Sequence, residues 1–158
     1  MASDAEGRAR ALAIALAELD AAAGRRAEIH MKACVRCGLC GQSCHIYRSE
    51  PTPANLPASK VEAVASLYRR RHTFLGRRAP WLVGARDLGP KDLESLVETV
   101  FGRCTGCGRC SLHCSIGLDV SAIVRAARRV LTEAGLTPDG LRRTVTTQIE
   151  TGNQMAVT

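Results

Sequence analysis

The chain has 158 residues, the size of one domain with a modest hydrophobic core. It contains eight cysteines but only 3% aromatic residues, which indicates that cysteine chemistry replaces part of an aromatic core. No apolar run approaches the roughly 18 residues of a membrane-spanning helix, so we expect no transmembrane segment, and peripheral membrane association stays open. The formal charge of +7 would suit a nucleic-acid partner, but stacking aromatics are nearly absent, and we expect no nucleic-acid binding.

Residues 1–27 are predicted to form an Ala-rich helix that contacts another subunit. Ser3 and Glu6 have the spacing of a capping box, and leucines recur after them at helical spacing: Leu12, Leu16 and Leu19. The short apolar run over residues 11–17 resembles the core of a signal peptide, but acidic residues close it at once. We therefore do not expect the protein to be exported.

Four further helices are predicted from apolar periodicity and from their Pro and Gly boundaries. A Pro-rich turn leads into a helix over residues 60–71. Residues 72–89 hold several glycines and a proline, so they are predicted to be a surface loop anchored by Trp81. Helices then follow over residues 90–101, from Asp119 or Ser121 to Gly135, and over residues 138–151.

The helix that starts near Asp119 has the clearest amphipathic pattern. Its core face should carry Ile123, Val124, Ala127, Val130 and Leu131, and its solvent face Arg125, Arg128 and Arg129. No segment alternates with the period of a strand, so we predict an all-α fold. The pattern of helix, cysteine run and helix occurs twice within residues 28–135, and a C-terminal helix and tail occupy residues 136–158.

Both cysteine runs have the spacing C-x₂-C-x₂-C-x₃-C. The first contains Cys34, Cys37, Cys40 and Cys44, and the second contains Cys104, Cys107, Cys110 and Cys114. Three cysteines at steps of three wrap a loop around one cubane cluster, and Gly38, Gly106 and Gly108 let backbone N–H groups approach its sulfides. The sequence therefore predicts two [4Fe-4S] clusters. With their thiolates, two such clusters lower the formal charge to about +3.

Other uses of eight cysteines fit less well. Zinc sites usually take two separated pairs of ligands, and radical-SAM enzymes use C-x₃-C-x₂-C spacing, which neither run has. Cysteines three apart in a glycine loop make poor disulfides.

In two-cluster ferredoxins with this motif, the fourth cysteine ligates the other cluster, and we carry that rule over to this chain. The fourth cysteine of each run is expected to begin the next helix. One cluster would then be held by Cys34, Cys37, Cys40 and Cys114, and the other by Cys104, Cys107, Cys110 and Cys44.

Two further groups of residues have a plain and a functional interpretation. His45 could donate to a cluster sulfur, but a solvent-facing position is the simpler expectation for it and for His30 and His113. The Arg69–Arg71 run is expected to be a solvated helix end, with docking of an acidic partner as the alternative.

The insert between the runs resembles the C-type iron–sulfur subunit of heterodisulfide reductase, a member of the α-helical ferredoxin family. The resemblance covers roughly residues 28–152 and rests on three stretches: Cys44-His-Ile-Tyr47 through Pro57-Ala-Ser-Lys60, Phe101-Gly-Arg-Cys104-Thr-Gly-Cys107, and the exit from Cys114 into Asp119-Val-Ser. His45 and Ser115 stand where bacterial ferredoxins often have proline, so helix entry after the fourth cysteine can differ.

The resemblance implies an α-helical ferredoxin fold and a cytoplasmic electron-transfer subunit. Its partners would be a flavoprotein subunit and a catalytic subunit with cysteine-rich CCG domains. Both runs consume all eight cysteines, so no CCG sequence is present here, and we expect no catalytic residue in this chain. Iron–sulfur subunits of glycerol-3-phosphate dehydrogenase or of fumarate and succinate reductases are the alternative, and an iron–sulfur regulator is a more distant one.

Overall fold

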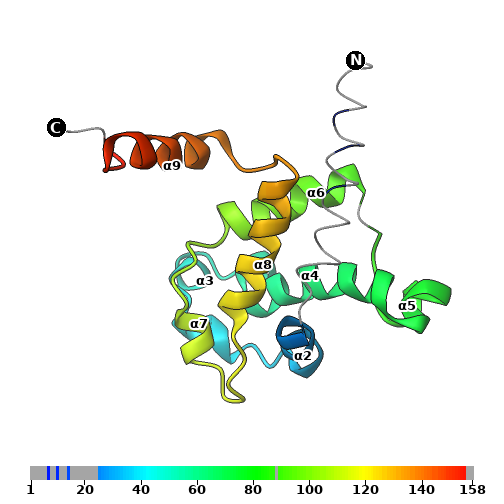
Figure 1. The fold of residues 1–158 in the computed structure, drawn as a ribbon. Helices are drawn as coiled ribbons and strands as arrows, with labels where there is room; N and C mark the ends of the chain where they lie inside the picture. The colour runs from blue at the N-terminus through cyan, green and yellow to red at the C-terminus, as the bar shows by residue number, and fades with distance from the viewer. Residues whose placement is uncertain (1–6, 8–9, 11–13, 15–24, 88, 156–158) are drawn as a thin grey trace.

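The structure is a computed structural model, which describes residues 7, 10, 14, 25–87 and 89–155 (Figure 1). All regular elements in these residues are helical, which confirms the all-α prediction. The predicted N-terminal helix, with its capping box and leucines, lies almost wholly outside them. The elements are α2 (Arg25–Ala33), η1 (Leu39–Ser43), α3 (His45–Ser49), η2 (Pro53–Asn55), α4 (Pro57–His72), α5 (Phe74–Arg78), η3 (Pro80–Leu82), α6 (Pro90–Val97), η4 (Glu98–Gly102), α7 (Arg109–Leu112), α8 (Val120–Glu133) and α9 (Asp139–Thr151).

The core forms where α2, α4 and α8 pack against one another. On α8 all five residues of the predicted core face are buried, and Leu131 is fully so. Val61 and Val64 of α4 and Val100 before the second cysteine run complete this core. Burial of such aliphatic side chains contributes about 1.5–3 kcal/mol each. The two longest helices thus form a rigid base for both cysteine runs.

α4 begins three residues earlier than predicted, because Pro57 occupies the first helical turn, where its missing N–H costs nothing. The helix predicted over residues 90–101 is present, but its last turn, η4, is a π-helix. The C-terminal helix is confirmed as α9, which projects away from the other helices in Figure 1. Its apolar side chains are exposed: Leu141, Val145 and Ile149.

The prediction of a loop over residues 72–89 is wrong in part, because the short helices α5 and η3 lie within this range. The Thr73 side chain caps α5 by accepting a hydrogen bond from the backbone N–H of Gly76 at 3.0 Å. The prediction that Trp81 anchors this segment is also wrong, because 76% of its surface is exposed. None of the described helices is long and apolar enough to cross a lipid bilayer.

Candidate iron–sulfur sites

The two cysteine loops have matching backbone conformations. Two positions after the first cysteine of each run, φ is positive, at 57° for Arg36 and 73° for Gly106. Two positions further on, Gly38 and Gly108 are also left-handed, and each precedes a short helix, η1 or α7. In the second loop, the Gly106 N–H donates to Cys104 Sγ at 3.4 Å. The sequence repeat is therefore also a repeat of backbone geometry.

Gly106 is required by its surroundings. A Cβ at this position would lie 3.1 Å from the guanidinium of Arg128, in addition to the strain of positive φ. Arg36 occupies the equivalent position in the first loop and is the one non-glycine residue with positive φ in the described chain. Its side chain forms an ion pair with Glu62 at 3.1 Å. Left-handed backbone costs a non-glycine residue about 1–2 kcal/mol.

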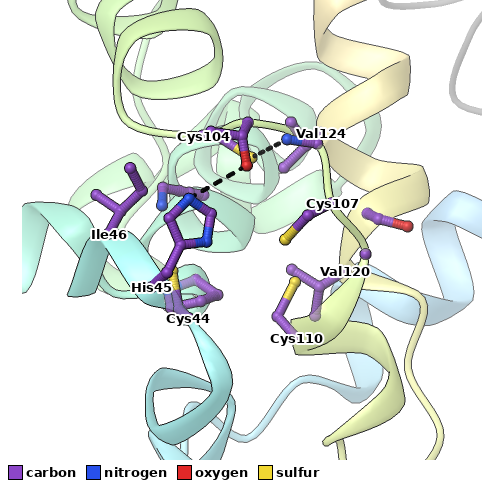
Figure 2. Close-up of a pocket in the computed structure, with 14 residues that line it drawn as sticks. Cys44, His45, Ile46, Cys104, Cys107, Cys110, Val120 and Val124 are labelled. Carbon is purple, nitrogen blue, oxygen red and sulfur yellow. Dashed lines mark hydrogen bonds between the residues drawn. The ribbon is translucent and has the colours of Figure 1, made fainter. Parts of the chain in front are cut away.

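The first cavity has about 420 Å³ of empty space, part of it open to solvent, and is lined by four cysteines from both runs: Cys44, Cys104, Cys107 and Cys110. We name it the Cys44 cavity. Figure 2 shows three of these side chains, from Cys44, Cys107 and Cys110, turned toward the same space. Its other walls include Pro57 and Lys60 of α4.

The second cavity, of about 430 Å³, is lined by the remaining four: Cys34, Cys37, Cys40 and Cys114. We name it the Cys114 cavity. Its nearly equal volume indicates that both cavities suit the same group. Val120, at the start of α8, lines both, so the cavities lie side by side.

The fourth cysteines reach these cavities differently. Cys44 is the N-cap of α3, as predicted. The same prediction is wrong for Cys114, because a turn separates it from α8, closed by a hydrogen bond from Gly117 N–H to the Cys114 carbonyl at 3.0 Å. Gly117 allows this turn because its φ is 69°.

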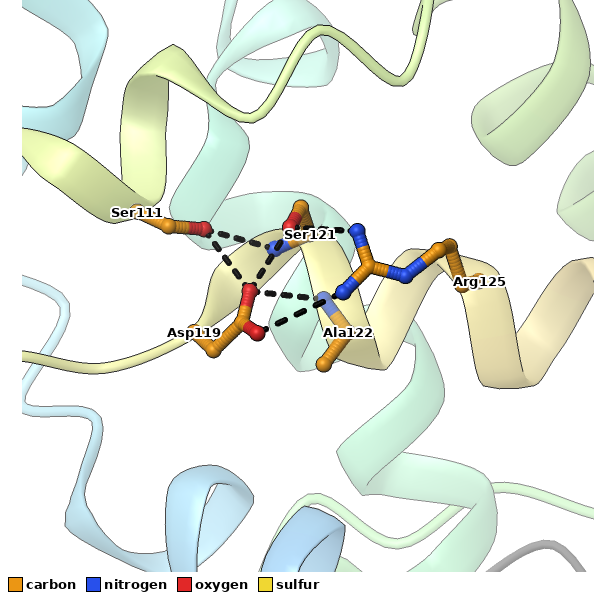
Figure 3. A network of polar contacts seen from close by, with 5 residues as sticks. All are labelled: Ser111, Asp119, Ser121, Ala122 and Arg125. Atoms are coloured by element: carbon orange, nitrogen blue, oxygen red, sulfur yellow. Dashed lines mark hydrogen bonds and ion pairs between the residues drawn. The ribbon is translucent and has the colours of Figure 1, made fainter.

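Asp119 then starts α8 and joins it to the second cysteine run (Figure 3). Its carboxylate accepts from the backbone N–H of Ala122 at 2.9 Å and from the hydroxyls of Ser121 at 2.7 Å and Ser111 at 3.0 Å. These hydrogen bonds, led by that of Ser121, lower the pKa of Asp119 to about 2. Ser111 directly follows Cys110, so this network fixes the second run relative to α8.

Burial raises the pKa of the Cys110 thiol to about 11, and the neighbouring Cys104 adds to this effect. Burial likewise raises the pKa of Cys40. Such thiols resist ionisation unless cations compensate, and the iron of a cluster supplies that compensation. Among the described residues, no three His, Cys, Asp or Glu side chains are close enough to hold one metal ion. A cubane instead takes each thiolate on a different iron, with the four sulfurs around a central space.

Lys60 gives a further indication of what the Cys44 cavity holds. It is 2% exposed, and its ammonium donates to the carbonyl oxygen of Asn55 at 2.9 Å. No carboxylate in the described chain forms an ion pair with it. A buried, unpaired cation is costly, and an anionic group in the adjacent cavity offsets that cost. The donor set and its charge therefore fit a thiolate-ligated cluster.

Sequence reasoning missed the role of Arg128, which was expected to face solvent. Its guanidinium donates to the carbonyl oxygens of Val100 at 2.8 Å and Cys104 at 2.6 Å. It also lies 5.2 Å from the ring centre of Phe101. Arg128 therefore fixes the start of the second cysteine loop to α8. It lies at the edge of the apolar face of α8, where periodicity alone does not separate an exposed arginine from a packed one.

Asn55 and Arg103 were also missed. Asn55 is 1% exposed, and its side chain donates to the Glu50 carbonyl at 2.9 Å and accepts from Arg103 at 3.2 Å. Because Arg103 directly precedes Cys104, this contact joins the insert to the second cysteine run. The signal available in the sequence was an asparagine placed between two prolines in a turn.

The histidines differ in their environments. His45 and His113 are exposed, as expected, and His45 Nε2 lies 3.4 Å from Thr105 Oγ1 beside the Cys44 cavity. The expectation for His30 is wrong, because this residue is half-buried and its Nδ1 is buried without a hydrogen-bond partner among the residues that the structure describes.

The predicted solvated arginine run is also engaged within the fold. Arg69 forms an ion pair with Glu62, and Arg70 forms one with Asp87 at 2.7 Å. Arg70 also donates to the Gly76 carbonyl at 3.3 Å. These arginines fasten the end of α4 to the segment that follows it.

Known proteins match this chain over most of its length. The chain is 35% identical over 133 residues to the Hdr-like menaquinol oxidoreductase iron-sulfur subunit 2 of Archaeoglobus fulgidus, covering 84% of this chain and 24% of that protein. It is 32% identical over 113 residues to a subunit of the dihydromethanophenazine:CoB–CoM heterodisulfide reductase of Methanosarcina barkeri, covering 71% of this chain and 26% of that protein. The chain thus spans about a quarter of the length of these relatives.

No solved structure gives a significant match. The 4Fe-4S dicluster domain matches residues 30–118, which include all eight cysteines. Together with two cavities of four cysteines each, this match shows that the chain binds two [4Fe-4S] clusters and belongs to the 4Fe-4S dicluster domain family.

Proposed function

We propose that this chain is the electron-transfer subunit of a heterodisulfide-reductase-like complex. It would relay single electrons between a flavoprotein subunit and a catalytic subunit with CCG domains. The observation that supports this most strongly is the shared wall at Val120, which makes the two cluster cavities neighbours. When bound, each [4Fe-4S] cluster stores one electron. Adjacent sites of this kind suit transfer from one to the other.

We propose the crossed ligand sets that the two cavities suggest. Cys34, Cys37, Cys40 and Cys114 would hold the cluster of the Cys114 cavity, and Cys104, Cys107, Cys110 and Cys44 that of the Cys44 cavity. Each set contains an exposed cysteine, Cys37 in one and Cys107 in the other. Each cluster would therefore lie beside a solvent-exposed ligand, and a relay needs such a route for electrons to and from its partners.

The relatives support the kind of complex. One is named as an iron-sulfur subunit of an Hdr-like menaquinol oxidoreductase and another as a heterodisulfide reductase subunit. Both are about four times as long as the matched region. We propose a cytoplasmic location with peripheral membrane contact for the complex.

Affinity purification of the tagged protein from its native cell, under anaerobic conditions, tests this function. We expect co-purification of a CCG-type subunit and a flavoprotein, and turnover of a thiol or disulfide substrate by the assembled complex. Recovery with a flavoprotein but without CCG domains would favour the glycerol-3-phosphate or fumarate and succinate type. Recovery as a monomer that reacts directly with soluble donors would make it a mobile ferredoxin and refute the subunit role.

A further inference from the structure

The Cys44 and Cys114 cavities are alike in cysteines and volume but differ in their charged walls. Lys60, in the first turn of α4, lines the Cys44 cavity and is 2% exposed. The charged side chain that lines the Cys114 cavity is Arg36, which is 60% exposed and paired with Glu62 at 3.1 Å. One cavity thus has a buried cation without an acidic partner in the described chain, and the other has a neutralised cation at the surface.

The position of Lys60 is fixed by its neighbours. Its ammonium has three N–H donors, and the Asn55 carbonyl accepts from one of them at 2.9 Å. Asn55 is itself held by Glu50 and Arg103. Lys60 is thus held in place as part of the wall of the Cys44 cavity, and its charge lies beside the space that the cluster would fill.

We propose that Lys60 is a positioning residue that raises the reduction potential of the cluster in the Cys44 cavity and makes the two clusters unequal. Reduction adds one electron to a [4Fe-4S]²⁺ core and no proton, so the anionic cluster gains one negative charge. A fixed buried cation attracts the reduced form more strongly than the oxidised form. Surface charges act less, because water and salt screen them. This inference rests on the proposed ligand sets and not on the identity of the partner subunits.

Redox titration of the purified holoprotein, followed by EPR with dithionite as reductant, tests this inference. In Lys60→Met we expect one cluster to become at least tenfold harder to reduce, which is a midpoint about 59 mV lower for one electron. The midpoint of the other cluster should move by less than a third of that. Lys60→Arg, which keeps the charge, should restore most of the shift. Lys91→Met, which removes an exposed lysine that lines neither cavity, should leave both midpoints unchanged.

Assignment of the two signals uses Cys107→Ser, which should alter the g-values of the cluster in the Cys44 cavity. Cys44→Ser should perturb the same EPR signal as Cys107→Ser. If it perturbs the signal of the other cluster, the proposed ligand sets are wrong, whatever the midpoints of the Lys60 variants show. Unchanged midpoints in a fully loaded Lys60→Met protein, or equal shifts of both clusters, would overturn the role of Lys60.

Two measurements keep the test decisive if Lys60→Met does not load both clusters. Lys60→Gln removes the charge but keeps a donor, and it should lower the same midpoint. In the unmodified protein, the midpoint of the cluster in the Cys44 cavity should depend less on ionic strength than that of the other cluster, because a buried charge is poorly screened. A stronger salt dependence at the Cys44 cavity would assign the effect to surface arginines and refute the proposal.

Discussion

Replacement of Arg128 by Met should loosen the second cysteine loop. The substitution keeps a long side chain on α8 but removes two charge-assisted hydrogen bonds, to the carbonyl oxygens of Val100 and Cys104. Hydrogen bonds to charged groups contribute about 1.5–3 kcal/mol, and the stacking on Phe101 adds about 0.5–1 kcal/mol. Water will hydrogen-bond to the freed carbonyl oxygens and recover part of this free energy, so we expect a net loss of about 2–4 kcal/mol in the free energy of unfolding.

The assay is anaerobic urea denaturation of the holoprotein, with helicity and cluster absorbance recorded together. Cluster absorbance should be lost at lower urea than in the unmodified protein, and the cluster in the Cys44 cavity should be lost first. Arg129→Met is the matched control, because Arg129 is the exposed neighbour of Arg128 on α8, and its effect should stay within about 0.5 kcal/mol. Equal effects of the two substitutions would show that Arg128 does not fix the loop.

Three further predictions concern the clusters and the start of α8. Anaerobically purified protein should contain about eight iron and eight sulfide per chain, and stoichiometric zinc without sulfide would contradict the two cubanes. Cys44→Ala should chiefly perturb the cluster held by the second run, and loss of only the first-run cluster in Mössbauer spectra would mean that each run is self-contained. Asp119→Ala should cost about 1 kcal/mol as a lost N-cap. The pKa of Asp119 is lowered from 3.8 to about 2 in the folded protein. The loss in free energy of unfolding caused by Asp119→Ala should therefore be constant above about pH 4 and shrink as the pH falls toward 2. Urea denaturation at a series of pH values measures it.

Apolar periodicity predicted the core face of α8. All five residues predicted for that face are buried, because packing against α2 and α4 favours an apolar residue at every third or fourth position. The cysteine spacing likewise predicted that the first three cysteines of each run lie around one space, because each loop is short. Both signals are local in sequence.

Features that depend on distant neighbours were missed. Trp81 is apolar, yet it is exposed, because η3 packs against α5 without covering this side chain. Lys60 and Arg128 are charged, and residue type alone places them at the surface. Arg128 is half-buried because it donates to the carbonyl oxygens of Val100 and Cys104, 28 and 24 residues away. Lys60 is buried in the packed first part of α4, where the Asn55 carbonyl accepts from its ammonium. α5 was missed because its Thr73 cap lies in a stretch whose Gly and Pro content indicated a loop.

Duplication of the cysteine run explains why there are two cavities but not how they differ. The first turn of α4 lies between them, with Pro57 and Lys60 on the Cys44 cavity and Ala58 on the Cys114 cavity. This turn belongs to the insert between the runs. Cluster potential depends on net charge, hydrogen bonds and exposure around the sulfurs, and this turn places a charged side chain at one cavity and an alanine at the other. Selection on a few insert residues can therefore set the order in which the clusters are reduced, while the ligand spacing stays the same.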